Sequence, residues 1–330
     1  MTTAGRAPAS DEALVVGGGI SGIACARVLH DAGVPTVVRD RGYRLGGRMA
    51  VRTLNGRPID VGASYFTARH PDFIAVVRSW EQAGLARPWT DTFHLATPEG
   101  MLGTTTGPVR YAAPLGLRSL VEAMAVGLAV SNHDEVSSVG PGPTVDGQNY
   151  AAAVLAMPAP QALDILEDEL SAERVALRGT WQPAVSLIAR FAERDWPEFD
   201  GVFVNESPVL TFIADDGRRR GDGEAVLVAH SHPVLAAAHL DNPERLLVVM
   251  LDELRAVLGI QRPPTETFVK RWSLARPLDT TASSFHLGAA TVGLCGDGWH
   301  GSPKIEGAFL SGRSVGRAIA RTLGAVPDRG

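Results

Sequence analysis

The sequence predicts an α/β fold, in which a nucleotide-binding domain with a parallel sheet is joined to a smaller α+β domain. A strand, a glycine-rich turn and a helix follow one another over residues 14–29, which is the local order of such a sheet. A second short strand of β-branched residues follows at 36–38. The chain has 330 residues, and a single hydrophobic core rarely serves more than about 250–300. Two domains are therefore expected.

The turn carries glycine at the spacing G-x-G-x-x-G, as Gly17, Gly19 and Gly22. In this pattern the first glycine permits a sharp turn, the second lets a pyrophosphate approach the backbone, and the third lets the helix pack closely. The helix N-terminus then faces the anion. The second strand ends at Asp40, 18 residues beyond Gly22, near the place of the acid that binds a ribose hydroxyl. These residues predict a Rossmann-type βαβ unit that binds an adenine dinucleotide.

Further segments resemble motifs of the flavin amine oxidase superfamily. Residues 44–49 (RLGGRM) and 59–66 (IDVGASYF) resemble its second flavin motif, in which the glycine pair and the arginine lie beside the pyrophosphate and the D-x-G-A segment passes close to the isoalloxazine. Residues 294–312 resemble its C-terminal flavin motif. The resemblance implies FAD as the cofactor and a glutathione-reductase-like fold. It also implies non-covalent binding, because neither cysteine lies at the attachment position of covalently flavinylated relatives.

The resemblance assigns the cofactor site residue by residue. The residues expected to bind FAD belong to these motifs or adjoin them: Gly17, Gly19, Ile20, Ser21, Gly22, Asp40, Arg41, Gly47, Arg48, Gly62, Ala63, Ser64, Val136, Asp297, Lys304 and Ile305. The helix that starts near residues 304–305 would aim its N–H groups at the flavin pyrimidine and stabilise negative charge on the reduced ring.

Within the superfamily, four segments resemble the renalase-like subgroup: 46–50, 60–69, 269–272 and 275–277. The resemblance implies an oxidase that moves hydride from misreduced dihydronicotinamide isomers, 2- or 6-dihydro-NAD(P), to FAD, releases NAD(P)+ and is reoxidised by O2 to give H2O2. The chain has two lysines, and its four tyrosines all precede residue 151, which argues against an ordinary amine oxidase site. Two alternatives stay open: an FAD-dependent amine oxidase or other small-molecule flavin oxidoreductase, and a dinucleotide-binding protein without turnover.

Four side chains are expected to face the substrate, because they adjoin the D-x-G-A segment or the C-terminal motif: Tyr65, Phe66, Trp299 and His300. For His300, core packing or a hydrogen bond within the turn is the alternative. Arginine suits the phosphates of a dinucleotide substrate, and the candidates are Arg69, Arg190 and Arg276. His230 and His232 have no adjacent Asp, Glu or Cys to complete a ligand set, so no metal site is expected.

The composition indicates the class of partner. A net charge of −5 gives no broad basic field for nucleic acid. The basic run 218–220 is bracketed by Asp215, Asp216 and Asp222, so a solvated turn is expected there. No run of eighteen apolar residues and no secretion signal is found, so we expect a cytoplasmic protein without a membrane contact, acting on a small molecule with O2 as acceptor. Cys25 and Cys295 are expected to be reduced core thiols.

The remaining elements are predicted from periodicity and from the positions of Gly and Pro. Helices are expected over 72–80, 117–128, 161–177 and 243–258, and strands near Phe93, near Met101 and over 152–157. A sheet is expected over 181–228, with turns at 206–208 and 216–217, and the chain is expected to return to the cofactor domain from Thr267. The FAD-binding domain is accordingly placed at 1–75, 110–160 and 262–330, and the substrate domain at 76–109 and 161–261. The oligomeric state is left open.

Overall fold

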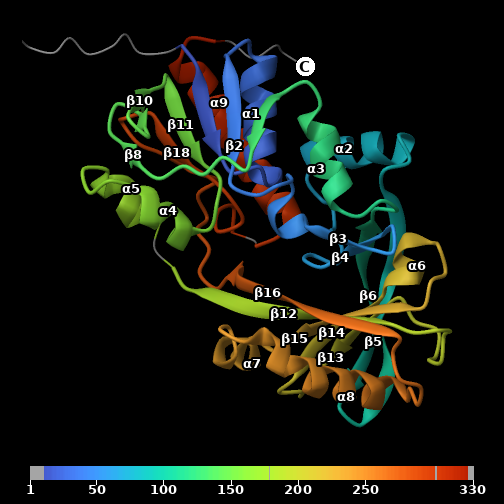
Figure 1. The fold of residues 1–330 in the computed structure, drawn as a ribbon. Helices are drawn as coiled ribbons and strands as arrows, with labels where there is room; N and C mark the ends of the chain where they lie inside the picture. The colour runs from blue at the N-terminus through green and yellow to red at the C-terminus, as the bar shows by residue number, and fades with distance from the viewer. Residues whose placement is uncertain (1–10, 178, 302, 326–330) are drawn as a thin grey trace, which may run out of the picture. The chain divides into compact units, whose positions relative to one another are not determined.

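The structure, a computed structural model, describes residues 11–177, 179–301 and 303–325 (Figure 1). The chain forms two compact units, each made of separate stretches of sequence. Unit 1 comprises Met1–Gly47, Val121–Thr180 and Pro277–Gly330, and unit 2 comprises Arg48–Leu120 and Trp181–Arg276. Each unit has its own sheets and its own hydrophobic core.

Unit 1 is built on a six-stranded sheet in the order β17-β18-β11-β1-β2-β7. The strands are β1 (Ala13–Val16), β2 (Thr36–Asp40), β7 (Ala129–Asn132), β11 (Ala152–Leu155), β17 (His286–Leu287) and β18 (Val292–Leu294). Neighbours from β18 to β7 pair in parallel, and β17 is antiparallel to β18. Strands β1 and β11 are buried at every residue, as central parallel strands usually are. The predicted α/β fold class and the strand–turn–helix unit are confirmed.

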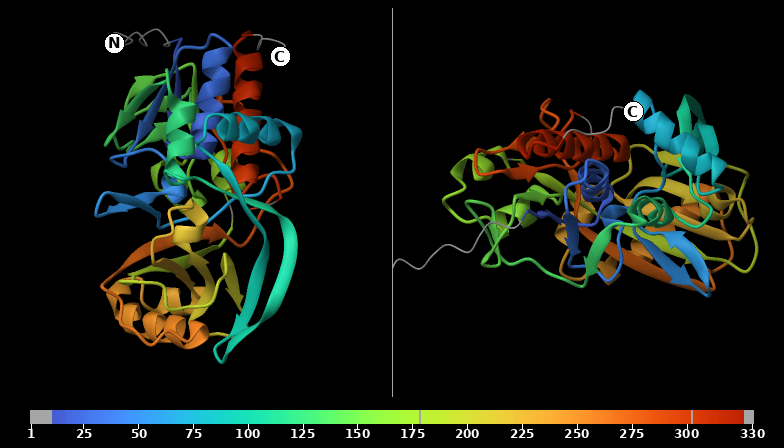
Figure 2. Two further views of the ribbon diagram at one scale, coloured as in Figure 1. Left: turned by 90° about the vertical axis from the view of Figure 1, so that its right-hand side faces the viewer. Right: turned by 90° about the horizontal axis from the view of Figure 1, so that it is seen from above.

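Helices α1 (Ile20–Asp31) and α9 (Ile305–Thr322) lie side by side in unit 1 (Figure 2). A Cβ atom on Gly312 of α9 would lie 1.9 Å from Ser21 O, and one on Gly316 would lie 2.9 Å from Cys25 O. Glycine lets the two backbones come this close, because any larger residue would clash. Cys25 and Cys295 are both buried and free, which confirms the prediction of reduced core thiols.

The predicted helix over 161–177 is instead two short helices, α4 (Ala159–Ile165) and α5 (Ser171–Ala176). They follow a small sheet of β8 (Val139–Gly140), β9 (Thr144–Val145) and β10 (Gln148–Asn149). Between the two helices, Glu167 N donates to Val139 O at 2.9 Å. Leu166 and Leu170 are buried in the core of unit 1 at the same place. Long-range pairing and burial therefore override the local helical pattern.

Unit 2 is built on a seven-stranded sheet in the order β16-β12-β15-β14-β13-β5-β6. The strands are β5 (Arg87–Thr97), β6 (Gly100–Ala112), β12 (Trp181–Arg190), β13 (Gly201–Val204), β14 (Leu210–Asp215), β15 (Val226–Ser231) and β16 (Glu266–Pro277). Strands β5 and β6 form a long hairpin where two short strands were expected. Helices α7 (Pro233–Ala238) and α8 (Leu246–Leu258) cover one face of the sheet, the lower one in Figure 1.

The other elements lie outside the seven-stranded sheet of unit 2, and the first of them, η1, begins at Gly47, the last residue of a unit 1 stretch. They are η1 (Gly47–Met49), β3 (Val51–Leu54), β4 (Arg57–Asp60), α2 (Pro71–Gln82), α6 (Asp216–Arg220) and η2 (Pro243–Arg245). Helix α2 confirms the predicted helix, and the side chain of His70 caps it by accepting a hydrogen bond from Asp72 N at 3.2 Å. Helix α3 (Arg118–Ala125), shorter than predicted, includes residues of both units. Helix α8 ends at Gly259, whose φ of 71° is left-handed, where the sequence predicted a helix end.

The units divide the chain at residues other than those we expected. Residues 48–75, 110–120 and 262–276 belong to unit 2, and residues 161–180 belong to unit 1. The chain does not leave the second sheet at Thr267, because residues up to Pro277 form β16, the edge strand beside β12. Strand β4 belongs to unit 2 because Asp60 at its end is bonded to Arg220 of α6.

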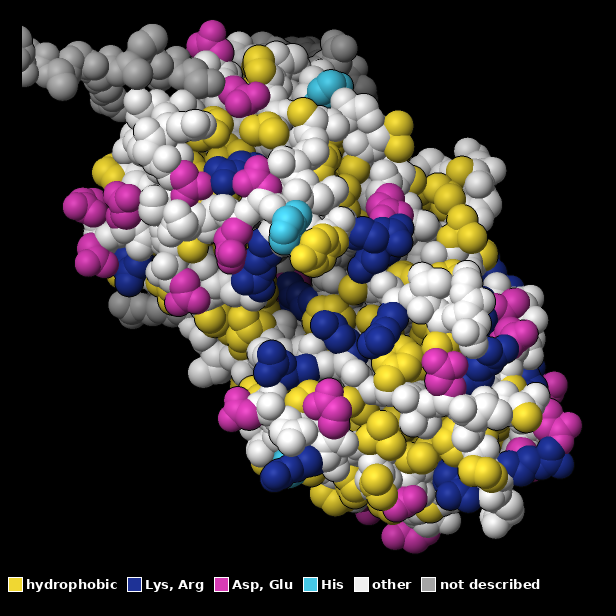
Figure 3. Space-filling model, in the orientation of Figure 1, with side chains coloured by type: hydrophobic (Ala, Val, Ile, Leu, Met, Phe, Trp, Pro, Cys, Tyr) yellow, Lys and Arg dark blue, Asp and Glu magenta, His cyan; other side chains and the backbone are white. Residues whose placement is uncertain are grey.

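Acidic side chains lie beside basic ones over much of the face drawn in Figure 3. This distribution agrees with the small net charge of −5. Among the described residues, none of the helices has both the length and the apolar character that crossing a membrane requires.

Candidate functional site

The glycine fingerprint of unit 1 has the geometry that a bound pyrophosphate requires. Gly17 has a φ of 110°, and a Cβ atom there would lie 2.6 Å from Ala156 O. A Cβ atom on Gly22 would lie 1.9 Å from Gly17 O. A Cβ atom on Gly19, in contrast, would meet no described atom within 4 Å. The turn itself therefore requires Gly17 and Gly22, whereas the space beside Gly19 is open to a ligand.

Asp40 lies at the end of β2 and shapes the same turn. Its Oδ2 accepts a hydrogen bond from Gly18 N at 2.5 Å, and its Oδ1 accepts one from Gly42 N at 2.7 Å. Each carboxylate oxygen has two lone pairs, so each retains one for a ribose hydroxyl. The position predicted for ribose binding is thus compatible with that role, and the carboxylate also holds the backbone of the turn.

The glycine pair of the second flavin motif lies against the fingerprint. Gly46 N donates to Gly18 O at 2.9 Å. A Cβ atom on Gly47 would lie 3.5 Å from Gly19 Cα. Two glycine-rich loops from separate parts of the sequence therefore meet at the open position. This arrangement fits a ligand longer than one fingerprint turn could hold, as FAD is.

Two helices of unit 1 begin at the flavin motifs without a side-chain cap. The N-cap residues are Gly19 for α1 and Lys304 for α9, and no side-chain hydrogen bond closes either first turn. The N–H groups of an uncapped helix start are available to an anion or to a carbonyl oxygen. Ser21 Oγ donates to Cys295 Sγ at 3.1 Å and so ties the start of α1 to the C-terminal motif.

The other predicted site residues of unit 1 differ in exposure. Ile20, Val136 and Asp297 are buried, Ile305 is half-buried, and Arg41 and Lys304 are exposed. Trp299 is 9% exposed and packs into the core of unit 1. His300 has a φ of 69°, and its backbone N–H donates to Ser283 O at 2.9 Å. Trp299 thus packs in the core and His300 lies in a turn, and their contact with a substrate stays a prediction.

Unit 2 contains the rest of the second motif. Ala63 N donates to Arg48 O at 2.9 Å, and a Cβ atom on Gly62 would lie 2.0 Å from the same oxygen. The Arg48 guanidinium lies over the Trp181 ring, 5.2 Å from its centroid, and donates to Ala275 O at 3.2 Å. Within this unit the motif arginine and the D-x-G-A segment are therefore held together.

The D-x-G-A segment is also fixed from the sheet. Val61 O accepts hydrogen bonds from Trp272 Nε1 on β16 at 2.7 Å and from Ser186 Oγ on β12 at 2.8 Å. These bonds give Trp272 a positioning role that sequence reasoning did not assign.

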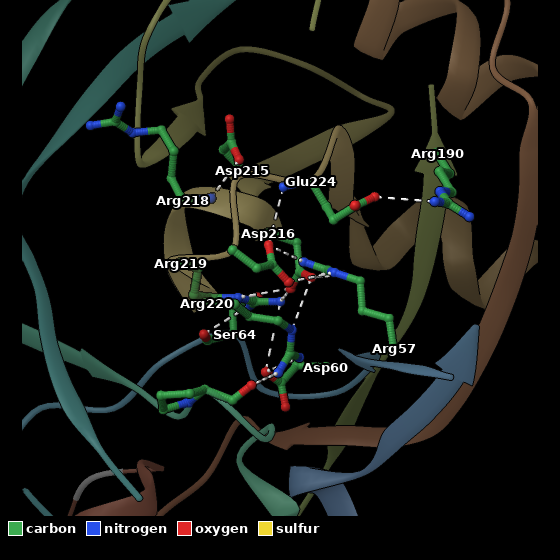
Figure 4. A network of polar contacts seen from close by, with 12 residues as sticks. Arg57, Asp60, Ser64, Arg190, Asp215, Asp216, Arg218, Arg219, Arg220 and Glu224 are labelled. Carbon is green, nitrogen blue, oxygen red and sulfur yellow. Dashed lines mark hydrogen bonds and ion pairs between the residues drawn. The ribbon is translucent and has the colours of Figure 1, made fainter. Parts of the chain in front are cut away.

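A buried ion-pair network overturns the prediction of a solvated turn at 218–220. These residues belong to α6, and Asp216 and Arg219 are fully buried. Figure 4 shows three arginines directed toward the Asp216 carboxylate, which accepts hydrogen bonds from Arg57, Arg219 and Arg220. The prediction was wrong because Arg57, which lies far from α6 in the sequence, returns to it through β4 in the fold.

Asp60, the first residue of the D-x-G-A segment, completes the network. Its Oδ2 accepts a hydrogen bond from Arg220 Nη2 at 2.8 Å, and its Oδ1 accepts one from Leu117 N at 2.7 Å. Arg219 Nη1 donates to Ser64 O at 2.9 Å. The network therefore holds both ends of residues 60–64.

The charges of the network set the pKa values of its two carboxyl groups. Burial raises the pKa of Asp60, although Arg220 and Arg219 oppose the rise. Burial also opposes ionisation of Asp216, but Arg219, Arg220 and Arg57 outweigh it and hold the pKa of that carboxyl far below its ordinary value. Asp216 is therefore the anion that compensates the buried arginines.

One side of unit 2 carries a group of rings that we call the aromatic wall: Tyr65, Trp89, Phe93, Phe203 and Phe212. The centroid of Phe93 lies 5.3 Å from that of Tyr65 and 5.2 Å from that of Phe203. Tyr65 belongs to the second flavin motif, so the wall begins at the D-x-G-A segment.

His230 continues the wall beyond Phe212, with their ring centroids 5.8 Å apart. Burial lowers the pKa of His230 to about 4, and the nearby Arg219 lowers it further, against a hydrogen bond to the backbone of Gly62. The imidazole is therefore neutral near pH 7.

Phe66 does not join Tyr65 on the wall. It is 3% exposed and stacks on Tyr111 with centroids 5.4 Å apart, and the edges of Phe73 and Trp80 complete its surroundings. Successive side chains of an extended segment point in opposite directions, which explains the separation. Phe66 thus packs among core rings, and its contact with a substrate stays a prediction.

The three arginines suggested as phosphate ligands lie at or near the surface of unit 2. Arg190 pairs with Glu224 at 3.1 Å, and Arg69 and Arg276 are exposed. Sequence reasoning missed the buried Arg110 of β6, for which no local pattern exists. It also missed the Asp216–Arg219–Arg220 pairing, for which the i, i+3 and i, i+4 spacing was a usable signal.

Comparisons with known proteins agree with the fold and the motifs. The family described as an NAD(P)-binding Rossmann-like domain matches residues 15–80. Amine oxidase [flavin-containing] B of Rattus norvegicus is 47% identical over 55 residues, which are 16% of this chain and 11% of that protein. Pseudooxynicotine dehydrogenase of a Pseudomonas species is 29% identical over 111 residues, 31% of this chain and 19% of that protein. The chain thus matches at most a fifth of the length of these relatives.

Solved structures match along nearly the whole chain. Cyclohexylamine oxidase of Brevibacterium oxydans superposes with a TM-score of 0.72 at 16% identity and covers 96% of this chain and 100% of that one. A triple mutant of putrescine oxidase, redesigned for cofactor binding, superposes with a TM-score of 0.76 at 15% identity and covers 95% and 99%. The fold is that of the flavin-dependent amine oxidases. The amine oxidase fold also confirms the predicted fold class, a Rossmann-type domain with a second α+β part.

Proposed function

We propose that this chain is an oxidoreductase that binds FAD non-covalently and oxidises a small molecule by accepting hydride from it. The observation that carries the proposal is the meeting of Gly47 with Gly19 beside the open position of the fingerprint. A nicotinamide dehydrogenase needs only the fingerprint turn, whereas FAD is also held by the second motif. The relatives and structural neighbours named above, among them flavin-containing amine oxidases, point the same way.

The two cysteines support non-covalent binding. Cys25 and Cys295 are both buried in the core. Burial raises the pKa of the Cys295 thiol to about 12, although the hydrogen bond from Ser21 opposes the rise. A thiol in that state is a poor nucleophile toward the flavin ring.

The chain's own residues would bind and orient the cofactor. In unit 1, the turn at Gly17–Gly22, the carboxylate of Asp40 and the uncapped starts of α1 and α9 would hold its polar groups. In unit 2, Trp272, Ser186 and Arg219 fix the backbone of the D-x-G-A segment, which would meet the flavin ring. FAD, when bound, supplies the two-electron chemistry, accepting hydride from the donor and passing both electrons to O2 to give H2O2.

For the donor we propose a dihydronicotinamide isomer, 2- or 6-dihydro-NAD(P), which leaves as NAD(P)+ after giving up hydride. Two features of the described residues support this choice. The half-buried rings of the aromatic wall, those of Tyr65, Trp89 and Phe203, offer flat surfaces to a planar ring. Neither the wall nor His230 carries a negative charge that would bind an ammonium group. Such a donor needs no proton removed before hydride leaves, so a site poor in titratable groups suffices.

Amine oxidation is the second candidate. It is favoured by the relatives and structural neighbours that are amine oxidases. The matched stretch of 55 residues is short, however, and it says little about the substrate.

Anaerobic stopped-flow of the purified holoprotein separates the candidates. Flavin absorbance is followed after mixing with 2- or 6-dihydro-NAD(P), with ordinary 4-dihydro-NAD(P), or with a panel of primary and secondary amines. We expect rapid bleaching by the 2- or 6-isomers alone. Bleaching by an amine alone would replace the proposed donor with the second candidate, and a flavin that no donor reduces would overturn the oxidoreductase assignment.

A further inference from the structure

The buried guanidinium of Arg110 is an unusual feature of unit 2. Arg110 lies near the end of β6 and is 6% exposed. Its Cζ lies 3.8 Å from the centroid of Phe93 and 5.7 Å from that of Tyr65. It therefore stacks on two rings of the aromatic wall.

Arg110 lacks the counter-charge that the other buried arginines have. Its Nη1 donates to the backbone oxygen of Asp91 at 2.7 Å, and no carboxylate among the described residues lies within ion-pair distance of it. Arg219 and Arg220, in contrast, both pair with Asp216. A buried cation without an anion is unfavourable, and aromatic rings attract it without neutralising it.

A second donor on the aromatic wall has no acceptor. Trp89 Nε1 is buried and has no partner among the described residues, and its ring lies 5.2 Å from that of Phe93. Buried donors are almost always bonded in folded proteins, so the unpartnered Trp89 Nε1 and the uncompensated charge of Arg110 on the same set of rings call for an acceptor from outside the chain.

We propose that the aromatic wall binds a planar ring that bears an anionic group, a carboxylate or a phosphate, and that Arg110 selects for that charge. This inference rests on the proposed function for its claim that the anion is part of the hydride donor. The donors of Arg110 and Trp89 bond the anionic group, and the half-buried ring of Tyr65 lies against the ligand's apolar part.

The same residues disfavour a cationic ligand. The fixed positive charge of Arg110 repels an ammonium group, and a neutral His230 offers it no compensation. A ligand with an ammonium group should therefore bind here more weakly than a neutral or anionic ring of equal size.

The test uses four ligands with one ring and different charges. Benzoate and phenyl phosphate are anionic, benzamide is neutral, and benzylamine is cationic at pH 7.5. Each is titrated anaerobically into the FAD-loaded protein, with binding followed by calorimetry and by the shift of the visible flavin band. The two anions separate a carboxylate site from a phosphate site.

Three variants accompany the wild-type protein. Arg110→Met removes the charge and keeps an apolar side chain over Phe93, and Arg110→Lys keeps the charge. Arg52→Met is the matched control, because Arg52 also lies over a ring of unit 2, Phe268 at 4.4 Å, but is exposed and away from the wall. FAD content and the thermal unfolding midpoint of each variant are recorded first.

We expect wild-type protein to bind at least one anion tenfold or more tightly than benzamide, and benzylamine weakest. Arg110→Met should lose at least tenfold in anion affinity and less than twofold in benzamide affinity, while Arg110→Lys and Arg52→Met keep the anion preference. Equal binding of all four ligands by wild-type protein would overturn the inference even if Arg110→Met did not fold, as would tightest binding of benzylamine. Anion binding that depends on Arg110, in a protein whose flavin no donor reduces, would instead retain the anion site and reject the proposed function.

Discussion

Arg219 Nη1 donates a hydrogen bond to Ser64 O at 2.9 Å, and this bond links α6 to the D-x-G-A segment of unit 2. The same guanidinium bonds Asp216, so the position of the segment depends on a carboxylate that touches neither the segment nor the aromatic wall. The flavin motif is therefore supported by side chains that the motif itself does not contain.

Replacing Asp216 with Asn should destabilise the protein strongly. The change removes the anion shared by Arg57, Arg219 and Arg220 and leaves buried cations uncompensated, which typically costs about 3–5 kcal/mol. Urea unfolding followed by tryptophan fluorescence measures the loss. Asp222→Asn is the control, because Asp222 also pairs with Arg57 but has a 37% exposed side chain and should cost no more than about 1 kcal/mol. Equal losses in the two variants would show that the buried network is not the main support of α6.

The free energy of unfolding should fall as the pH falls from 6.5 toward 4, because of His230. Burial lowers its folded-state pKa to about 4, from 6.5, so the unfolded chain binds the proton first. The contribution is at most about 1.4 kcal/mol per pH unit within that window. His230→Asn should make the pH dependence flatter there.

His232→Asn is the matched control for that titration. His232 caps α7 by accepting a hydrogen bond from Val234 N at 3.3 Å, and Asn is an equally good cap. Its unfolding curves should keep the wild-type slope between pH 4 and 6.5. A wild-type slope in His230→Asn as well would mean that His230 is protonated in the folded protein.

Alanine at two glycines of the fingerprint should have opposite effects on fold and cofactor. Gly22→Ala places a Cβ atom 1.9 Å from Gly17 O and should lower the stability of the apoprotein. Gly19→Ala meets no described atom within 4 Å, so the apoprotein should keep its unfolding midpoint. Its methyl group would instead occupy the space proposed for the pyrophosphate and raise the Kd for FAD by about tenfold or more. Unchanged FAD affinity in Gly19→Ala would move the pyrophosphate elsewhere.

Substitutions of Trp299 test whether its side chain serves only to pack the core of unit 1 or also contacts the substrate. Because it packs in the core of unit 1, Trp299→Ala should cost about 3–5 kcal/mol of stability. Trp299→Phe keeps most of the packing and should leave the rate of flavin reduction within about twofold of wild type, a difference worth less than 0.5 kcal/mol by the usual conversion. A tenfold slower reduction in a stable Trp299→Phe variant would support the substrate contact that the sequence suggested.

The parts of the fold that local sequence determines could be predicted. The strand, turn and helix around Gly17–Gly22 depend on neighbouring residues, and so does the end of α8 at Gly259. The break between α4 and α5 could not be predicted, because it comes from the bond of Glu167 N to Val139 O. Thr267 was assigned to the cofactor domain because nothing in its own segment shows that β12 will pair with it.

The candidate site divides in the same way. Glycine positions and Asp40 follow from the constraints of a tight turn, so their spacing alone carries the information. The burial of Arg219 could not be predicted, because the basic run of α6 has the local composition of a solvated turn. Its burial depends on Asp60 and Arg57, which bond to α6 from about 160 residues away in the chain. The role of Arg110 depends on Phe93 and Tyr65, which come to it only through the β5–β6 hairpin and the bridge from Phe66 to Tyr111.

Identification of the bound cofactor tests most directly the central claim, that the chain binds FAD non-covalently. The protein is purified in the dark, its visible spectrum is recorded, and the chain is then precipitated with heat or acid so that the supernatant can be separated by chromatography. We predict that FAD appears in the supernatant in an amount equimolar with the chain and that the precipitate is colourless. Absence of flavin from protein that has been incubated with excess FAD, or flavin that stays in the precipitate, would contradict non-covalent FAD binding.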